Sequence, residues 1–548
     1  MNEEENELIG FEKEQKGDNK DLLLENTKDN VSFCRKIRIY IIILCILLVI
    51  VGIIIVLYFL LSGKKNDENK GGEEGGEEGG EGEEEDEKEE EDDGRTCETG
   101  EEEKCLTCDG PRCASCNLGY KLSEGKCILN YSFKATYFTN LNNTKVRLIN
   151  PDYLKKIKEM NIDGNNEEPN TYYDFPSNGE HTVYMLLDMN NDVSLEKLFY
   201  FIEDMVSISF SEMLNAVNVI DMNSMFYQCS SLVSVKFPKN FNFQNVKKMN
   251  HMFYKCSSLT SLNISISKNV ETTSFMFGLC ESLSSLTINP FDTQNLKDMS
   301  YMFAYSFSPL FKSVNLSNLN LENVENMSYL FQGSSNLVSI DLSNLNTKKV
   351  KYIQGMFQYC YNLVSINLNN FNTQNVENMQ SLFGSCKNLS SIDLSSFNFE
   401  KVTDLSEMFS RCYSFSSIDL SNFKTEKVTS MSGMFYNCHS LTSLNISNFN
   451  TENVKTIENM FNGCNSLTSL NLSNFNTLKV ENYEKMFYNC DKLSSIDISS
   501  FSNETDSIFN IFNYNIPEEG HLTVKSSFYN QIMDTTVLEK WIIDLLDN

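Results

Sequence analysis

The sequence predicts an α/β solenoid whose coils are each 26 residues long. A Met-Phe or Leu-Phe pair recurs along the chain, and from Leu330 to Met486 the step between successive pairs is always 26 residues. Each pair is accompanied by a Leu-x-x-Leu-x-Leu pattern or a close relative, as at Leu467, Leu470 and Leu472. A fixed period of this length with this leucine pattern is typical of leucine-rich repeats, which stack into a solenoid.

The apolar positions within one coil predict how the coil closes on itself. The leucines of the pattern alternate with polar residues, which indicates a short strand. Val454, Ile457 and Phe461 recur at steps of three and four residues, which favours one or two helical turns, with Thr451 as their cap. One coil cannot cover its own apolar face, so burial comes from stacking on the neighbouring coils.

The first part of the chain carries a predicted membrane anchor. Residues 1–36 are polar and lack periodicity, which predicts a disordered cytoplasmic tail. Its two acidic dileucine patterns, Leu8-Ile9 and Leu22-Leu23, are either clathrin-adaptor sorting signals or chance matches. From Ile39 to Leu61 there are 23 uncharged residues, enough to cross a hydrocarbon core of about 30 Å. We therefore expect a transmembrane signal anchor over 37–61.

The chain after the anchor indicates on which side of the membrane the C-terminal part lies. Cationic residues flank the apolar run on both sides and favour a cytoplasmic N-terminus only slightly. A dense cysteine cluster and nine Asn-x-Ser/Thr sequons follow, as expected outside the cytosol. The expected location is the plasma membrane with the C-terminal side extracellular. An endosomal or vacuolar membrane is the alternative.

Residues 62–96 predict a flexible acidic stalk. Between Gly71 and Gly94 fifteen residues are acidic and one is lysine, so like charges repel and extend the segment. The whole chain has a formal charge of −30, and this tract supplies nearly half of it. An acidic balance of this size argues against a nucleic-acid partner.

Six cysteines in 97–127 predict a disulfide-rich module. Two Cys-x-x-Cys pairs lie only four residues apart, whereas zinc sites of this kind have a longer loop between the pairs. Three disulfides of open connectivity are therefore favoured over a metal site. The stretch NLGYKLSEGKC resembles the disulfide-rich modules of growth-factor-receptor ectodomains. The six residues are Cys97, Cys105, Cys108, Cys113, Cys116 and Cys127.

Changes of pattern set the remaining boundaries. Short alternating runs separated by turn residues predict a small β-rich cap domain over 128–193, which covers the first coil. The solenoid is expected over 194–515 and a C-terminal cap over 516–548. In that cap His521 to Val524 predicts a strand, and Val537 to Leu546 predicts a closing amphipathic helix with Trp541 buried.

The coil motifs NMSYLF, VTSMSGMFYNC and LTSLNISNFNTENV resemble the BspA-like leucine-rich repeat of surface proteins. The pattern is nearly complete from Thr425 to Val454. The resemblance implies a cell-surface protein of adhesion, antigen or partner-binding type without enzymatic activity. The anchor here lies N-terminal to the repeats, with a stalk and a cysteine module between them. The resemblance therefore predicts the fold of this chain more readily than its ligand.

The strand residues between the inward leucines are expected to form a concave face. Protein-binding hot spots are rich in Trp, Tyr and Arg, and these rows contain none. We expect weak multivalent contact with carbohydrate or a like surface, or a merely solvated face. Asp393 and Asp419 on adjacent coils could share a cation, but too few further oxygens accompany them to predict a metal site. The rows include Ser261, Asn263 and Ser265; Ser339, Asp341 and Ser343; and Ser443, Asn445 and Ser447.

Two further residue types recur with the coils. Nine cysteines share one position, but Ser306, Ser334 or Asn515 replaces them in three coils, so we interpret them as free, buried packing residues. The sequons either carry glycans, with Asn263, Asn315, Asn445 and Asn471 on the concave strands, or are by-products of an Asn/Ser-rich repeat. They stand at Asn130, Asn142, Asn263, Asn315, Asn326, Asn388, Asn445, Asn471 and Asn503.

Catalysis finds no support in the sequence. The four histidines have no recurrent nucleophile or metal partner, and no phosphate-binding loop appears. We expect no enzyme, no cofactor and no metal. The predicted function is recognition or adhesion at the cell surface by a leucine-rich repeat protein. The expected partner is an extracellular protein or glycan, the oligomeric state being open. A passive surface coat or antigen and an endocytic or vacuolar sorting receptor are the rival hypotheses.

Overall fold

The computed structural model describes residues 105–546 apart from short segments. These are 110–111, 117–119, 124–125, 130, 141–144, 190–191, 240, 242, 290–292, 307, 309–311, 314–315, 317–318, 502–510, 513–515 and 533–537. The predicted tail, transmembrane anchor and stalk lie outside the described residues. Within the described part, no helix combines the length and apolar character needed to cross a bilayer.

The cysteine-rich segment forms two short antiparallel strand pairs. β1 (Cys105–Asp109) pairs with β2 (Arg112–Cys116), and β3 (Tyr120–Ser123) pairs with β4 (Lys126–Leu129). No disulfide occurs among the side chains that the structure describes. The six cysteines of the predicted disulfide-rich module are not among these side chains, so its disulfides stay a prediction.

A six-stranded sheet follows, in the order β14-β12-β5-β10-β7-β8. Its longest strands show why it forms, because β5 (Phe133–Thr139) and β10 (Gly179–Leu187) bury alternate residues. The others are β7 (Ile157–Ile162), β8 (Asn165–Glu167), β12 (Met205–Phe210) and β14 (Ser234–Lys236). Beside it β6 (Lys145–Arg147) pairs with β9 (Tyr172–Asp174), and η1 (Pro151–Lys156) precedes β7.

This sheet corrects the prediction of a separate β-rich cap over 128–193. β12 and β14 belong to the first coils, yet β12 pairs with β5 and β14 pairs with β12. The rings of Phe133 in β5 and Phe199 in the first coil also lie 5.0 Å apart, edge to face. The region 131–189 and the first coils therefore share one core, because the edge of the sheet is completed by strands of the solenoid.

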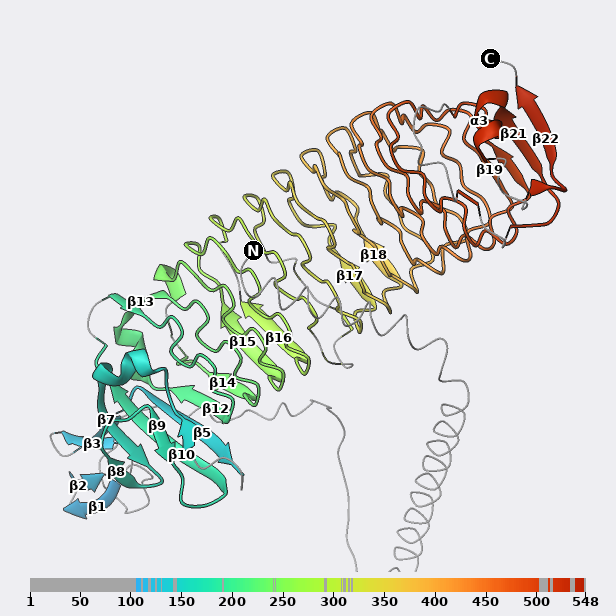
Figure 1. Ribbon diagram of the computed structural model, residues 1–548. Helices are drawn as coiled ribbons and strands as arrows, with labels where there is room; N and C mark the ends of the chain where they lie inside the picture. Colours follow the sequence, from blue (N-terminus) through green and yellow to red (C-terminus); the bar gives the residue numbers. More distant parts are fainter. Residues whose placement is uncertain are drawn as a thin grey trace, which may run out of the picture. The chain divides into compact units, whose positions relative to one another are not determined.

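The solenoid consists of parallel coils that stack in chain order, from green through yellow to red in Figure 1. Ten successive parallel bridges link one residue of each coil to the next, from Asp221 to Asn482. Short strands pair in register: β11 (Asp192–Ser194) with β13 (Asn218–Asp221), β15 (Ser261–Ser265) with β16 (Ser285–Asn289), and β17 (Ser339–Asp341) with β18 (Ser365–Asn367). Two 3-10 turns, η2 (Glu212–Ala216) and η3 (Phe243–Asn245), lie among the first coils.

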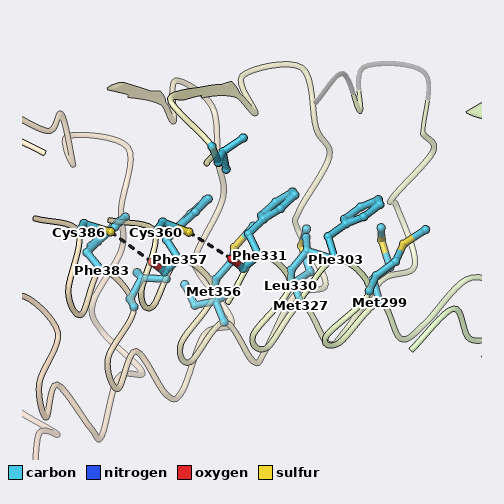
Figure 2. Packing of buried hydrophobic residues seen from close by; sticks show 14 of the residues in the cluster. Met299, Phe303, Met327, Leu330, Phe331, Met356, Phe357, Cys360, Phe383 and Cys386 are labelled. Atoms are coloured by element: carbon cyan, nitrogen blue, oxygen red, sulfur yellow. Dashed lines mark hydrogen bonds between the residues drawn. The ribbon is translucent and has the colours of Figure 1, made fainter. Parts of the chain in front are cut away.

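The core of the solenoid is a phenylalanine ladder, one ring per coil from Phe199 to Phe512. Neighbouring ring centroids lie 5.2 to 6.1 Å apart, and the rings are nearly parallel. Figure 2 shows Phe303, Phe331, Phe357 and Phe383 in this ladder, with Met299, Met327 and Met356 beside them. Stacked rings of this geometry add to the free energy of apolar burial, so each coil is held by its neighbours.

The predicted helical half of each coil is wrong, and the fold is a β-solenoid with almost no helix. Consecutive turns take its place: the Cys360 amide donates to the Phe357 carbonyl three residues back, whereas the Phe357 amide donates to Leu382 of the next coil at 3.0 Å. Two residues four apart in each coil, such as Gly355 and Tyr359, have positive φ values of 59° and 61°. An α-helix cannot accommodate them, although turns give the same three- and four-residue spacing.

The buried threonine predicted to cap a helix bridges two coils instead. The Thr451 hydroxyl donates to the carbonyl of Asn476 in the next coil, 25 residues further on, at 2.9 Å. Thr425 does the same to Asn450 at 2.8 Å and also accepts from the Asn450 amide at 2.7 Å. Because Thr425 and Thr451 are buried, their hydroxyls satisfy backbone groups that water cannot reach.

The C-terminal region adds two strands to the stack. β19 (Ser469–Asn471), β20 (Ser495–Asp497), β21 (His521–Lys525) and β22 (Ile542–Leu546) form one parallel sheet. The predicted strand at His521 is confirmed. The predicted closing helix is wrong, because its second half is β22, and the only α-helix in the described residues of this region is α3 (Ser526–Ile532). Trp541 is buried as expected and its Nε1 donates to the Pro517 carbonyl.

Candidate functional site

The outward side chains of the short strands form the strand face, for which the sequence predicts either weak multivalent contact or a merely solvated surface. In β15 the burial alternates as expected, with Ser261 and Asn263 exposed and Leu262 and Ile264 buried. Register-paired strands then align like residues across coils, as Ser339 with Ser365 and Asp341 with Asn367. The strand face is therefore a set of straight rows of small polar side chains.

Most of these polar groups already have partners within their own coil. Asp341 Oδ1 accepts the Ser343 amide at 2.9 Å and the Ser343 hydroxyl at 2.6 Å. Asn445 and Asn471 accept from Ser447 and Ser473 in the same way. Such turns stabilise the end of each strand. The strand face consequently repeats one structural motif, which explains its uniform composition without a ligand.

The aspartates of the strand face keep their charge for the same reason. The Ser343 hydroxyl bond lowers the pKa of Asp341, and the Ser395 hydroxyl bond lowers the pKa of Asp393. The Ser421 amide lowers the pKa of Asp419, while the charge of Asp393 on the adjacent coil raises it. Within the described residues, no group of three or more His, Cys, Asp or Glu side chains is arranged to hold a metal ion.

The nine repeated cysteines are free and buried, as predicted. Each thiol donates to the carbonyl of a ladder phenylalanine in the preceding coil, as Cys360 does to Phe331 and Cys386 to Phe357, both at 3.2 Å (Figure 2). Ser334 makes the equivalent bond to Phe303 at 2.9 Å. Burial raises the pKa of the Cys438 thiol to about 12. These thiols therefore serve the packing of the coils and not nucleophilic chemistry.

Five predicted sequons lie in the described part of the chain and differ in environment. Asn263, Asn388, Asn445 and Asn471 are exposed, and all but Asn388 lie on the strand face. Asn326 is half-buried, and Ser328 of its sequon is buried and donates its hydroxyl to the Asn326 side chain at 2.7 Å. Occupancy stays a prediction. Asn130, Asn142, Asn315 and Asn503 lie outside the described residues.

Among the remaining predicted site residues, the backbone brings two pairs of cysteines together. The backbone register sets Cys105 opposite Cys116 and Cys108 opposite Cys113, and Cys127 lies in β4. Cys97 and the dileucine residues Leu8, Ile9, Leu22 and Leu23 lie outside the described residues.

The four histidines lie in different parts of the fold. His181 bonds Asp163 at 2.6 Å and the Ser177 carbonyl at 2.9 Å, and His521 bonds Asp544 at 2.6 Å. His251 lies in an aromatic stack with Phe275, at 4.9 Å between ring centroids. Burial lowers the pKa of His251 to about 4. The fourth, His439, is exposed.

One row of side chains outside the strand face was not singled out from the sequence. It follows the cysteine position directly and contains Tyr361, Lys387, Tyr413 and His439, each 26 residues after the last. All four reach the surface, and they contact one another through rings and charge. Reading the solvent-facing positions that vary between coils, instead of those that repeat, would have found it.

Comparison with known proteins gives a family and several similar folds. The model of the family described as "Mycoplasma protein of unknown function, DUF285" matches residues 193–309, 273–392, 305–418 and 403–517, which together span the solenoid. No curated protein matches the chain.

Solved structures similar to this chain include bacterial leucine-rich repeat proteins. A leucine rich cell surface protein from Faecalibacterium prausnitzii is 18% identical, with 64% of this chain and 86% of that chain covered and a TM-score of 0.33. A leucine-rich repeat protein from Eubacterium ventriosum is 18% identical, with 56% and 88% covered and a TM-score of 0.31. One from Bacteroides ovatus is 18% identical, with 56% and 90% covered and a TM-score of 0.27.

Proposed function

The chain belongs to the family described as "Mycoplasma protein of unknown function, DUF285", and on that premise we propose that it is a non-enzymatic cell-surface repeat protein for recognition or adhesion. The repeated motifs are similar to the BspA-like surface repeat, which agrees with this role. The partner would be an extracellular protein or a glycan.

One observation carries the proposal: the backbone groups of each coil hydrogen-bond to the neighbouring coils, and the side chains face the solvent in aligned rows. Parallel bridges join every coil from Asp221 to Asn482, so few backbone groups are left for a partner along the flanks. Each row presents one side chain per coil at the strand spacing of about 4.8 Å. A surface of this kind suits repeated, weak contacts whose avidity grows with the number of coils engaged.

Binding of the full-length chain to intact cells and to immobilised glycans and matrix proteins tests this function. The proposal requires saturable binding to at least one of these surfaces. A matched surface coated with an unrelated acidic protein of similar net charge controls for non-specific electrostatic binding. Absence of saturable binding to every surface would contradict the proposal.

We further propose that the solenoid faces the extracellular side at the plasma membrane. The exposed sequons Asn263, Asn445 and Asn471 support this, since they are accessible to a glycosylation machinery. An impermeant amine-reactive label on intact cells should modify solenoid lysines such as Lys351 and Lys424, both well exposed. Labelling that required permeabilised cells would instead indicate an internal compartment.

A passive coat is a second candidate, and the strand face favours it. Its aspartates and asparagines are engaged by serines of their own coils, and three exposed sequons lie there. A glycan map distinguishes the two roles. Full occupancy of Asn263, Asn445 and Asn471 would cover the strand face and support a coat, whereas unoccupied asparagines there would remove that support.

A further inference from the structure

Two cations lie among tyrosines on the flank of the solenoid, Lys387 directly after Cys386 and Arg411 directly before Cys412. The ammonium of Lys387 lies 4.1 Å from the ring centroid of Tyr361 and 5.8 Å from that of Tyr413, one coil to either side. The guanidinium carbon of Arg411 lies 5.5 Å from the ring centroid of Tyr436. Cations at these distances are attracted by the ring faces. All five side chains are partly exposed.

Neither cation has a carboxylate partner among the described residues. Elsewhere on the flank lysines pair with acidic residues across coils, as Lys351 does with Glu325 and Lys424 with Glu400, each at 2.8 Å. Lys387 and Arg411 instead make no ion pair in the described part of the chain, although the whole protein has a formal charge of −30. The protein thus leaves two positive charges unneutralised on adjacent coils.

The two charges are also close enough to oppose each other. Partial burial lowers the pKa of Lys387, and the charge of Arg411 lowers it further. His439 extends the row, its ring stacked 4.8 Å from Tyr413 at an interplanar angle of 3°. The first acidic residue beyond it is Asp491, which accepts from Asn465 at 2.7 Å. Mutual repulsion without a counter-charge is a cost that a bound anion would remove.

We propose that Lys387 and Arg411, with Tyr361, Tyr413 and Tyr436, form a binding site for an acidic saccharide, a sugar chain that carries carboxylate or sulfate groups. The proposal rests on the proposed recognition function and names its partner chemistry. The cations would bind the acidic groups through charge-assisted hydrogen bonds. The apolar face of a sugar ring would pack on Tyr361, because the residue at the same place in the preceding coil is Ser335, which is too small to cover the ring.

An acidic peptide fits this surface less well than a saccharide. Peptides bind a sheet by adding a strand to an open edge, but here each coil is already bridged to the next on both sides, as Asn378 is to Tyr352 and to Asp404. What remains is a shallow row of charged and aromatic side chains. Such a row matches a ligand that presents acidic groups and ring faces but needs no backbone pairing.

Binding of full-length protein to immobilised heparin, polygalacturonate, neutral dextran and poly-glutamate tests the proposal. The protein should be made in a host without N-glycosylation, because the sequon Asn388 adjoins Lys387. The variant K387N/R411N gives two coils the asparagines that Asn465 and Asn437 already supply at these places. Arg411 and Asn437 have the same φ of 57°, which asparagine accommodates readily, so folding should be preserved. K351N/K424N, which removes two lysines that pair with carboxylates, is the charge-matched control.

We expect wild type and K351N/K424N to bind heparin or polygalacturonate alike and dextran not at all, and K387N/R411N to bind at least about tenfold more weakly. Equal binding by K387N/R411N would overturn this site, while saturable binding of the same variant to cells would leave the recognition function standing. Poly-glutamate binding as tight as saccharide binding would overturn the saccharide assignment in favour of an acidic peptide. No binding of wild type to either acidic saccharide would overturn the proposal as well.

Discussion

The ring of Tyr329 occupies the space that a side chain at Gly355 would need. A Cβ added at Gly355 would lie 2.2 Å from Cε1 of Tyr329, and Gly355 has a φ of 59°. Tyr305 covers Gly333 in the same way at 2.2 Å. A tyrosine in one coil therefore requires a glycine in the next coil, so the residues at these two positions depend on each other.

The first prediction is that Gly355→Ala lowers the free energy of unfolding by about 2 to 4 kcal/mol. The alanine would have to adopt the left-handed backbone conformation, and its methyl group would clash with the ring of Tyr329. In a Tyr329→Ala background the same change should cost only the backbone part, about 1 kcal/mol. Ser381 and Glu407, at this place in the next coils, have φ values of 53° and 55°, so a side chain is tolerated where no ring lies above it. Denaturant titration of wild type, Gly355→Ala, Tyr329→Ala and the double variant measures the coupling between the two residues. If the two single-variant losses simply add up in the double variant, the prediction is contradicted.

The second prediction concerns the threonines that bridge coils. Thr425→Val keeps the volume of the buried side chain but leaves the Asn450 amide and carbonyl without the hydroxyl that they bond. We expect a loss of about 2 to 4 kcal/mol in the free energy of unfolding. Thr429→Val, at an exposed threonine, is the control and should cost little. If both variants unfold at the wild-type denaturant concentration, the bridging role is wrong.

The third prediction is that Cys438 tolerates serine and resists alkylation. Its thiol donates to the Phe409 carbonyl at 3.1 Å, a bond that the Ser334 hydroxyl already makes to Phe303. Cys438→Ser should therefore change the free energy of unfolding by less than about 1.5 kcal/mol, whereas Cys438→Ala leaves the carbonyl unpaired and should cost more. Iodoacetamide should label Cys438 only after unfolding, because burial raises the pKa of its thiol to about 12. Rapid labelling of the native protein would argue against a buried thiol.

The fourth prediction concerns pH. Burial lowers the pKa of His251 from 6.5 to about 4, so the unfolded chain binds a proton more readily than the folded one. The contribution of His251 to stability is present above about pH 6.5 and is lost as the pH falls toward 4, up to about 3 kcal/mol. His251→Phe copies Phe275 of the next coil and should remove this loss. The difference in unfolding free energy between the two proteins should grow from pH 7 to pH 4, and a constant difference would contradict it.

The sequence predicted the repeat and its buried positions because both are periodic. The 26-residue step, the alternating leucines and the free thiols are confirmed by β15, by the phenylalanine ladder and by bonds such as Cys360 to Phe331. The helical half was mispredicted because turns with positive φ at Gly355 and Tyr359 give the same apolar spacing as a helix. The positive φ values and the bonding of alternate amides to the next coil distinguish these turns from a helix, and the apolar spacing reveals neither.

The proposed binding site was missed for the opposite reason. The outward residues predicted from the sequence lie at strand positions, which repeat and therefore align from coil to coil. Lys387 and Arg411 stand at positions whose residue changes from coil to coil, and only the stacking of coils brings them beside Tyr361, Tyr413 and Tyr436. A row defined by variation gives no periodic signal. The structure was needed to show that its members touch.

The central claim is that the solenoid binds through Lys387 and Arg411 on its flank and not through the strand face. Cell binding by three full-length proteins tests it most directly. The proteins are wild type, K387N/R411N, and D393N/D419N, whose asparagines copy Asn445 and Asn471 of other coils. We predict that D393N/D419N reaches half-saturation at the wild-type concentration, whereas K387N/R411N requires at least about tenfold more. The reverse order, with binding lost in D393N/D419N and kept in K387N/R411N, would contradict the account.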